Sequence, residues 1–307
     1  SGRGNMITGT STFGIGLWNE KTSYNIVQGN IIGTDTSGTV TLGSFSGGIF
    51  IEWANNSLIA DNMIGGYADN GISIGNAPDG YNTVSRNYIS SDISSGEAYG
   101  IALHNTGFNT IGPSNEIINN DGAGIAVFGE EAVGNHITRN SIHDNTGPGI
   151  DIWDGGNCDR VVPFILDFDL NTGSLSGWVF PNSTVEIFSD SSDEGKFYEA
   201  EAIADSSGFF SFRSGVSFAG PHLTATATDS NGNTTGFSYP TTGSSGSSGS
   251  QTGNSGIITR FQSKTSDQLV EDVRLGYDAR AQSAGEVEGI SNYVYEIFNI
   301  GAKRIDT

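Results

Sequence analysis

Cysteine is nearly missing from this sequence of 307 residues, which contains only Cys158. A single thiol excludes an internal disulfide framework, so the fold must be stabilised by packing and by any bound ions. We expect Cys158 itself to be a small, buried apolar side chain. Proline is also scarce, with 7 residues, and the 45 glycines follow no three-residue period, which excludes a collagen-like chain.

Basic residues are few as well: 13 Lys and Arg stand against 34 Asp and Glu, which gives a formal net charge of −21. An acidic surface repels phosphate backbones and anionic lipids, and we therefore expect no nucleic-acid partner. No apolar run approaches the roughly 20 residues of a membrane-spanning helix, so we expect no membrane insertion.

The first half of the chain repeats one phrase, a glycine followed by residues that alternate between branched apolar and other side chains. The phrase occurs at 14–17, 48–51, 71–74, 100–103, 124–127 and 149–152. Its copies begin 23 to 34 residues apart, a period typical of a solenoid in which each repeat is one structural turn. Period-two alternation predicts that Ile15 and Leu17, with their counterparts, share one buried face.

A second phrase recurs out of step with the first: an Asn, a branched apolar residue, and another Asn five or six positions on. It begins at Asn25, Asn56, Asn82, Asn109 and Asn135 and ends at Asn30, Asn62, Asn87, Asn115 and Asn140. Each turn is therefore expected to carry three short strands. Because Asn tolerates left-handed backbone and bonds through its side chain, we expect these residues to turn the chain and to hydrogen-bond to their copies in neighbouring turns.

The segment 29–43, GNIIGTDTSGTVTLG, is similar to the repeat of bacterial and archaeal right-handed parallel β-helix surface proteins. The similarity covers about residues 1–155. It implies an all-β fold whose first domain, residues 1–160, is a right-handed parallel β-helix of about six coils, with residues 33–47 as a loop inserted into the second coil. This fold hosts lyases, hydrolases, adhesins and inert stalks alike, so it does not decide the activity.

After Asp159 the pattern changes to separate strands with turn signals between them. Seven strands are predicted, at 161–168, 174–180, 184–189, 197–204, 208–213, 223–229 and 235–239. Seven strands in about 80 residues predict a small immunoglobulin-like (Ig-like) β-sandwich over residues 161–240. The stretch 223–235 resembles the last hairpin of bacterial Ig-like modules that follow this type of β-helix, with Asn231 and Gly232 in its turn.

The C-terminal part is predicted to be a strand-rich tail on a tether. Residues 241–256 form a flexible Gly/Ser linker, and residues 257–307 form an incomplete β-strand unit that is too short to close an Ig-type core. Its assembly strands contain Ile257, Ile258, Phe261, Val273, Leu275, Tyr277, Tyr293, Tyr295 and Ile297. We expect them to complete a neighbouring subunit, which leads to head-to-tail self-association; alternatively the tail begins a further domain.

Catalysis on this fold requires acids gathered on one exposed face of the coils. Alternation predicts two outward columns: Gly16, Phe50, Ser73, Ala102, Ala126 and Asp151, and beside it Trp18, Glu52, Gly75, His104, Phe128 and Trp153. The carboxylates here, with Asp154, are spread over as many as four coil steps, about 20 Å, whereas paired-carboxylate hydrolysis needs about 5–10 Å. We therefore predict no catalytic residues.

Aromatic and basic side chains suggest contacts of another kind. The aromatic residues of the two columns are predicted to contact a surface glycan or a partner protein, or else to pack beneath loops. They are Trp18, Phe50, Phe128 and Trp153. Arg86 and Arg139 occupy equivalent corners, and we expect each to pair with an acid on the neighbouring coil.

No metal-ligand spacing connects the histidines, so no transition-metal site is predicted. Calcium is the one cofactor that the sequence suggests, because one loop crowds oxygen ligands at Asp190, Asp193 and Glu194. A second oxygen-rich stretch, Asp229 to Asn233, is first of all a turn sequence.

These observations favour a non-enzymatic structural or adhesive protein, extracellular or on the cell surface, and a filament subunit linked through its C-terminal strands. The expected partners are further copies of the chain and surface glycans. Two alternatives remain. One is a polysaccharide-active lyase or hydrolase that uses the face between Glu52 and Asp154, and the other is a carbohydrate-binding module that uses Trp18 and Trp153.

Overall fold

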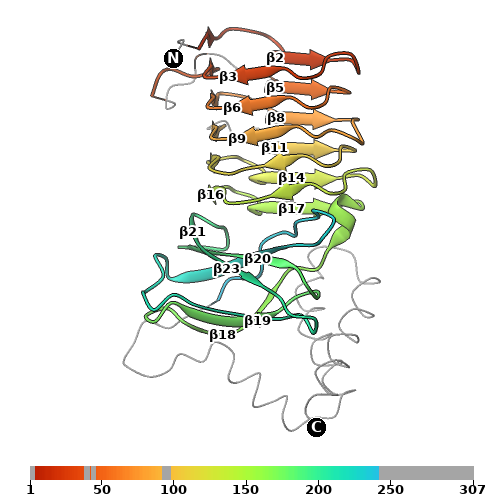
Figure 1. Cartoon of the computed structure of the whole chain (residues 1–307). Coiled ribbons are helices and arrows are strands. Elements are labelled where there is room, and N and C mark those ends of the chain that lie inside the picture. The colour runs from red at the N-terminus through yellow and green to blue at the C-terminus, as the bar shows by residue number, and fades with distance from the viewer. Residues whose placement is uncertain (1–3, 38–41, 43–45, 92–97, 242–307) are drawn as a thin grey trace, which may run out of the picture. The chain divides into compact units, whose positions relative to one another are not determined.

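The computed structural model describes residues 4–37, 42, 46–91 and 98–241 of the chain (Figure 1). Its described elements are strands and one short 3-10 helix, η1 (Gly156–Asp159), so the described fold is all-β. None of the described helices could cross a membrane. The predicted assembly strands, 257–307, and the predicted linker after residue 241 lie outside the described residues.

Strands β1 to β17 form a parallel β-helix built of three sheets (Figure 1). The glycine-led sheet contains β2 (Phe13–Trp18), β5 (Gly47–Glu52), β8 (Asn70–Gly75), β11 (Tyr99–His104), β14 (Ile125–Phe128) and β17 (Ile150–Trp153). The middle sheet contains β3 (Ile26–Gln28), β6 (Leu58–Ala60), β9 (Thr83–Ser85), β12 (Thr110–Ile111) and β15 (His136–Ile137). The closing sheet contains β1 (Met6–Ile7), β4 (Ile31–Ile32), β7 (Met63–Gly65), β10 (Tyr88–Ser90), β13 (Glu116–Ile118) and β16 (Ser141–His143).

The expectation of three strands per turn is confirmed. About five turns are complete, from β2 to β16, and β17 begins a further turn that the chain leaves through η1. The predicted number of about six coils was therefore slightly too high, because the last glycine-led strand is not followed by strands of the other two sheets.

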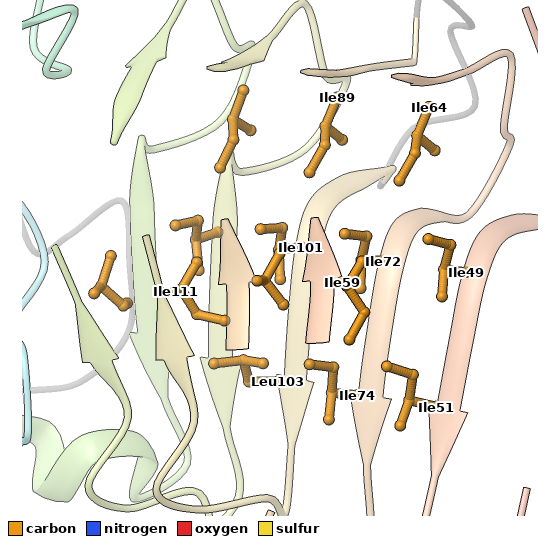
Figure 2. Packing of buried hydrophobic residues seen from close by; sticks show 14 of the residues in the cluster. Ile49, Ile51, Ile59, Ile64, Ile72, Ile74, Ile89, Ile101, Leu103 and Ile111 are labelled. Atoms are coloured by element: carbon orange, nitrogen blue, oxygen red, sulfur yellow. The ribbon is translucent and has the colours of Figure 1, made fainter. Parts of the chain in front are cut away.

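Apolar side chains in register fill the inside of the β-helix. Ile49 pairs with Ile72, and Ile72 pairs with Ile101, and all three are buried. Figure 2 shows isoleucines of the three sheets, among them Ile59 and Ile89, meeting in the interior. Stacking at about 4.8 Å removes each side chain from water against its copies in the turns above and below. The predicted ladder of branched aliphatic residues is confirmed.

The glycine that begins each phrase has a packing role. A Cβ at Gly71 would lie 2.5 Å from Ile89 Cγ2 and 2.6 Å from the Gly100 carbonyl oxygen, and the equivalent glycines of the other complete turns are equally close to an isoleucine of the closing sheet. Such distances leave no room for a side chain. The repeat therefore needs glycine where the chain bends into the glycine-led strand.

The asparagines form hydrogen-bonded ladders, as predicted. In the ladder that precedes the closing sheet, Asn62 donates its backbone N–H and its side-chain amide to Asn87 Oδ1, both at 3.0 Å, and Asn87 donates both groups to Asn115 in the same way. A second ladder passes through Asn82, Asn109 and their copies. Each rung satisfies buried polar groups that water cannot reach.

The expectation that these asparagines adopt left-handed backbone holds for Asn56 alone, whose φ is 52°, and was wrong for the others. The left-handed residue is the one before each ladder Asn: φ is 56° at Asp61, 55° at Arg86, 66° at Ser114 and 48° at Arg139. The turn is thus made one residue earlier, and this leaves the Asn side chain directed into the ladder. Different residue types tolerate the turn because the ladder hydrogen bonds, repeated in every turn, hold it in place.

After η1 the chain forms two antiparallel sheets of three strands (Figure 1). One contains β18 (Phe164–Asp169), β19 (Ser174–Trp178) and β22 (Phe209–Arg213), and the other contains β20 (Thr184–Asp190), β21 (Phe197–Ile203) and β23 (His222–Thr228). The predicted seventh strand, 235–239, is not a strand, although the Thr235 and Ser238 N–H groups donate to carbonyl oxygens of β23. The relationship to Ig-like modules stays a prediction.

The two-sheet region closes the last turn of the β-helix, and both belong to one compact unit. Ile142 of β16 and Gly195 exchange two backbone hydrogen bonds, at 3.1 and 2.9 Å. The Ile137 N–H donates to Thr234 Oγ1 at 3.0 Å. Phe237 packs against the buried core of the β-helix. The backbone groups that a following turn would satisfy are thus satisfied by side chains and loops of the second region.

Cys158 corrects another expectation. It lies in η1, where its φ of 60° is left-handed, and its side chain is exposed and not in a disulfide. Cys158 lies at the end of the β-helix, as expected, but the chain there bends sharply from β17 toward β18. Such a bend turns the thiol out of the core instead of into it.

Candidate functional site

The outer face of the glycine-led sheet carries the predicted aromatic residues. The register pairs Trp18 with Glu52, Glu52 with Gly75, Gly75 with His104, His104 with Phe128, and Phe128 with Trp153. We call this set the outer column. The second predicted column, from Gly16 to Asp151, lies beside it in the same register. The register of both columns agrees with the alternation, but Ala102 and Ala126 of the second column are buried.

The first aromatic cluster lies at β2 and β5 and contains Phe13, Trp18 and Phe50. The Phe13 and Phe50 rings stack with centroids 4.4 Å apart, and Trp18 lies 5.8 Å from Phe50 at a tilt of 46°. A Cβ at Gly16 would lie 2.3 Å from the Trp18 indole, so this ring covers the strand itself. Half of the Trp18 surface stays exposed (50%).

The second aromatic cluster lies at β11, β14 and β17. His104 and Phe128 stack with ring centroids 4.8 Å apart, and Phe128 and Trp153 stack at 4.6 Å with planes only 5° apart. Tyr99 adds a tilted contact to Trp153 at 6.0 Å. These spacings equal the distance between turns, so the rings form a stack along the β-helix in which Phe128 has both faces covered.

Between the two aromatic clusters the outer column contains a polar residue, Glu52, and a glycine, Gly75. Glu52 accepts a hydrogen bond of 2.7 Å from the side-chain amide of Asn76. Gly75 follows Glu52 in the column and has no side chain. Trp53, next to Glu52 in the chain, has φ of 58° at the end of β5 and is 46% exposed. His104, the next residue of the column, is exposed, and its Nε2 lies 3.0 Å from Asn105 Nδ2.

The acids of this face do not gather. Glu52 lies on β5, and Asp151 lies on β17, four strands away in the same sheet, which is about 19 Å at the usual strand spacing. Burial raises the pKa of Asp151, and the Ile152 backbone hydrogen bond opposes that shift. Glu52 and Asp151 are thus farther apart than the roughly 5–10 Å that separate the two acids of a glycoside hydrolase.

The two predicted arginine pairs have different outcomes. Arg86 donates to both carboxylate oxygens of Asp61, at 2.7 and 3.0 Å, and Asp61 occupies the equivalent corner of the neighbouring coil as predicted. Arg139 instead contacts the two-sheet region, because Nη2 donates to Glu201 Oε2 at 3.0 Å and the guanidinium lies over Tyr198. The last coil has no following coil, so its arginine pairs with the region that replaces one.

The residues of the predicted calcium loop are only partly accessible. Asp190 and Glu194 are 2% exposed, whereas Asp193 is exposed. Both oxygens of Glu194 accept hydrogen bonds from Asn145, at 2.8 and 3.0 Å. Oδ2 of Asp190 is buried and has no hydrogen-bond partner. Among the described residues no three His, Cys, Asp or Glu side chains gather as a metal site, and calcium stays a prediction.

The second oxygen-rich stretch is a turn. Oδ1 of Asp229 accepts the backbone N–H groups of Asn231 and Asn233, at 2.8 and 2.9 Å, and Oδ2 accepts the Asn233 amide and Arg160. With these oxygens engaged, its structure favours the turn interpretation over the calcium one.

Phe13, Trp53 and Tyr99 were not predicted for this face, and Gly75 was predicted only as a member of the column. Trp53 and Tyr99 lie just outside the alternating positions that were used to select outward side chains. Gly75 was placed in the column as a member without a side chain. The signal that could have singled it out is that every other position of the column has a large side chain.

Comparisons with known proteins give one family match, which supports the fold, and two distant structural similarities. A family model described as periplasmic copper-binding protein (NosD), a parallel β-helix family, matches residues 46–162. The chain is also similar to the enzymatically active domain of tailspike protein 2 from bacteriophage CBA120, with 11% identity, a TM-score of 0.28, and coverage of 73% of this chain and 53% of that chain. It spans about half of that structure. Full-length tailspike protein 2 from an Escherichia coli O157:H7 bacteriophage gives 12% identity, a TM-score of 0.15, and coverage of 67% and 40%. No curated protein matches. The chain is a parallel β-helix repeat protein.

Proposed function

We propose that this chain is a non-enzymatic structural or adhesive protein of the cell surface or another exported compartment. The observation that carries the proposal is the outer face of the glycine-led sheet, where two aromatic clusters flank a polar strip and the carboxylates are spread over about 19 Å. Such a face is suited to holding a glycan or a protein partner and unsuited to breaking a bond.

An exported location is supported by two features. The matched family is named for periplasmic proteins, and the chain has a net charge of −21, which suits a soluble protein that avoids anionic lipid and nucleic acid. Copper does not follow from the family name. His143, the most buried histidine, bonds to Asp144, and the described residues contain no gathered set of nitrogen and sulfur ligands.

Head-to-tail self-association through residues 257–307 and an Ig-like β-sandwich over residues 161–240 extend the proposal. The two-sheet region already satisfies backbone groups at the end of the β-helix, so the proposed self-association assigns the completing role to the C-terminal strands and not to this end. Mass measurement of the purified full chain tests this part: oligomers that disappear on removal of residues 252–307 are expected, and a monomer at every concentration would contradict it.

The main experiment separates adhesion from catalysis. The full chain is incubated with a panel of neutral and acidic polysaccharides, and two quantities are measured: retention on the insoluble members, and release of reducing ends or unsaturated products. We expect retention on at least one polysaccharide and no turnover. Turnover that disappears in Asp151→Ala would instead show an enzyme on this face. The absence of both retention and turnover would limit the proposal to a purely structural role.

A further inference from the structure

The outer column has one vacant position. Large side chains precede and follow Gly75 in the register, Glu52 on one side and His104 on the other. A Cβ at Gly75 would meet only the His104 carbonyl oxygen, at an ordinary 3.6 Å, and its φ lies outside the left-handed range. Unlike Gly71, therefore, Gly75 is required neither by packing nor by backbone conformation. The open space above it is a feature of the surface, which we call the Gly75 notch.

We propose that the Gly75 notch binds a single neutral pyranose ring of a surface glycan. The inference rests on the adhesive function proposed above and names the ligand class for that face. The sugar ring would take the position that an aromatic side chain occupies elsewhere in the outer column. It stacks on His104 and hydrogen-bonds to Glu52 on the opposite side.

The dimensions of the stack support a ring at this position. Successive rings of the second aromatic cluster are 4.8 and 4.6 Å apart, one coil step each. His104 stacks on Phe128 with one face, so its other face is directed along the column toward Gly75. The strands of Glu52 and His104 are two steps apart, about 9.6 Å, which leaves space for one ring between their side chains.

The polar groups around the notch suit hydroxyl groups. Asn76 donates to Oε1 of Glu52, and a carboxylate with two oxygens retains capacity to accept a sugar hydroxyl as well. When Asn105 Nδ2 donates to His104 Nε2, the imidazole is neutral with its proton on Nδ1, and a neutral ring presents an apolar face to the C–H groups of a sugar. Trp53 is exposed at the adjoining corner, where its backbone N–H donates to the Gly75 carbonyl oxygen at 3.1 Å.

Charge selects against acidic sugars. The notch contains the Glu52 carboxylate, and the whole chain has a net charge of −21. A uronate would therefore meet repulsion both from its nearest neighbour and from the long-range field of the protein. Neutral hexoses meet neither.

The test uses four probes on the isotope-labelled full chain: the methyl glycosides of glucose, galactose and mannose, and glucuronate. Resonances of the Gly75 amide and the His104 ring are followed by NMR during each titration. We expect at least one neutral glycoside to shift both resonances to saturation, and glucuronate to bind at least tenfold more weakly. Gly75→Phe fills the notch and should weaken binding at least tenfold while leaving the melting temperature at or above that of the wild type. His104→Ala, which removes the stacking face, should weaken it about threefold to tenfold.

The matched control is Tyr81→Ala, which removes one ring of another exposed stacked pair, Tyr81 and Phe108, with centroids 5.3 Å apart. Its affinity should stay within twofold of the wild type. The proposal is overturned if no neutral glycoside shifts the two resonances, or if Gly75→Phe binds like the wild type. Retention of both wild type and Gly75→Phe on the polysaccharides of the previous experiment would then leave the adhesive function standing and remove only this subsite.

Discussion

The same hydrogen-bonding pattern occurs inside the β-helix and at its end. The acceptor is a neutral amide oxygen inside and a carboxylate at the end. Asn120 donates its backbone N–H and its side-chain amide to Asn145 Oδ1, at 3.1 and 2.8 Å. Asn145 donates the same two groups to Glu194 of the two-sheet region, at 3.0 and 2.8 Å. Glu194 therefore takes the place of the Asn that a further turn would supply.

The apolar core ends in the same manner. A Cβ at Gly71 would meet Ile89 of the closing sheet, whereas a Cβ at Gly149, just before the last glycine-led strand, would meet the Phe237 ring at 2.7 Å. One aromatic side chain of the second region thus replaces the next isoleucine. At these two contacts the two-sheet region takes the place of a further turn of the β-helix.

The interior of the β-helix and its junction with the two-sheet region differ in their titratable groups. The interior ladders consist of amides, which do not titrate between pH 4 and 9. The junction contains two buried acids. Burial raises the pKa of Glu186, although hydrogen bonds from Thr138 and Arg139 oppose the shift, and burial raises the pKa of Glu194 to about 7. Stability of the interior should therefore be insensitive to pH, and stability of the junction should depend on it.

The largest effect is expected from breaking an interior ladder. Asn87→Ala removes the oxygen that accepts two hydrogen bonds from Asn62 and the amide that donates to the Ile59 carbonyl oxygen and to Asn115. Several buried groups lose their partners, and we expect the free energy of unfolding to fall by about 3–5 kcal/mol, measured by urea denaturation. The exposed Asn171→Ala is the control; equal losses in the two variants would show that the ladder contributes nothing.

A smaller effect is expected from the repeat glycine. Gly71→Ala places a methyl group 2.5 Å from Ile89 Cγ2 and should lower the free energy of unfolding by about 2–3 kcal/mol, because two coils must separate locally. Gly75→Ala, four residues on in the same strand, is the matched control and should stay within about 0.5 kcal/mol of the wild type. A large loss at Gly75 would mean that the notch is a packing requirement and not a vacancy.

Glu194 should make the junction more stable in acid. Its pKa is near 4.5 when unfolded and about 7 when folded, because burial disfavours its charge by more than the Asn145 hydrogen bonds favour it, and Asp190 and Asp193 add a smaller repulsion. The folded chain holds the proton more tightly, so this contribution is fully present below pH 4.5 and is lost as the pH rises through 7. Between pH 5 and pH 8 the free energy of unfolding should fall by about 2 kcal/mol from this group.

Glu194→Gln tests the assignment. An amide oxygen can accept both Asn145 donors, as Asn145 Oδ1 does from Asn120, so the variant should keep the junction and lose most of the pH dependence. Thermal melts at pH 5, 6, 7 and 8 measure it, with Glu20→Gln at an exposed turn as control. An unchanged pH profile in Glu194→Gln would assign the dependence to other groups, Glu186 first.

Most of the β-helix could be predicted from the sequence, because its rules repeat. Each copy of the glycine phrase and of the Asn phrase supplies independent support for the same register, and errors in one copy are corrected by the others. What the repeat could not reveal is how it ends. Cys158, Phe237 and Glu194 occupy positions that no repeat defines, so only the fold shows what they contact.

The candidate site was predicted in part for the same reason. Alternation placed Trp18, Phe128 and Trp153 on one outer face, since side-chain direction in a strand follows from position. Whether rings cover one another depends on side-chain rotamers, which the alternation does not determine. The stack from His104 to Trp153 and the vacancy at Gly75 therefore came from the structure.

The smallest effects on the melting temperature are expected from the two corner arginines. Arg86 lies within the β-helix, and Arg139 lies at its junction with the two-sheet region. Arg86 and Asp61 are both well exposed, so Arg86→Ala should leave the melting temperature within about 1 °C of the wild type. Arg139 contacts Glu201 and the Tyr198 ring of the other region, and Arg139→Ala removes both contacts across the junction. We expect Arg139→Ala to lower the melting temperature more than Arg86→Ala does. Arg139→Ala removes contacts between two regions, whereas Arg86→Ala removes one surface ion pair. Equal decreases would mean that hydrogen bonds such as those of Glu194 hold the junction without help from surface charge.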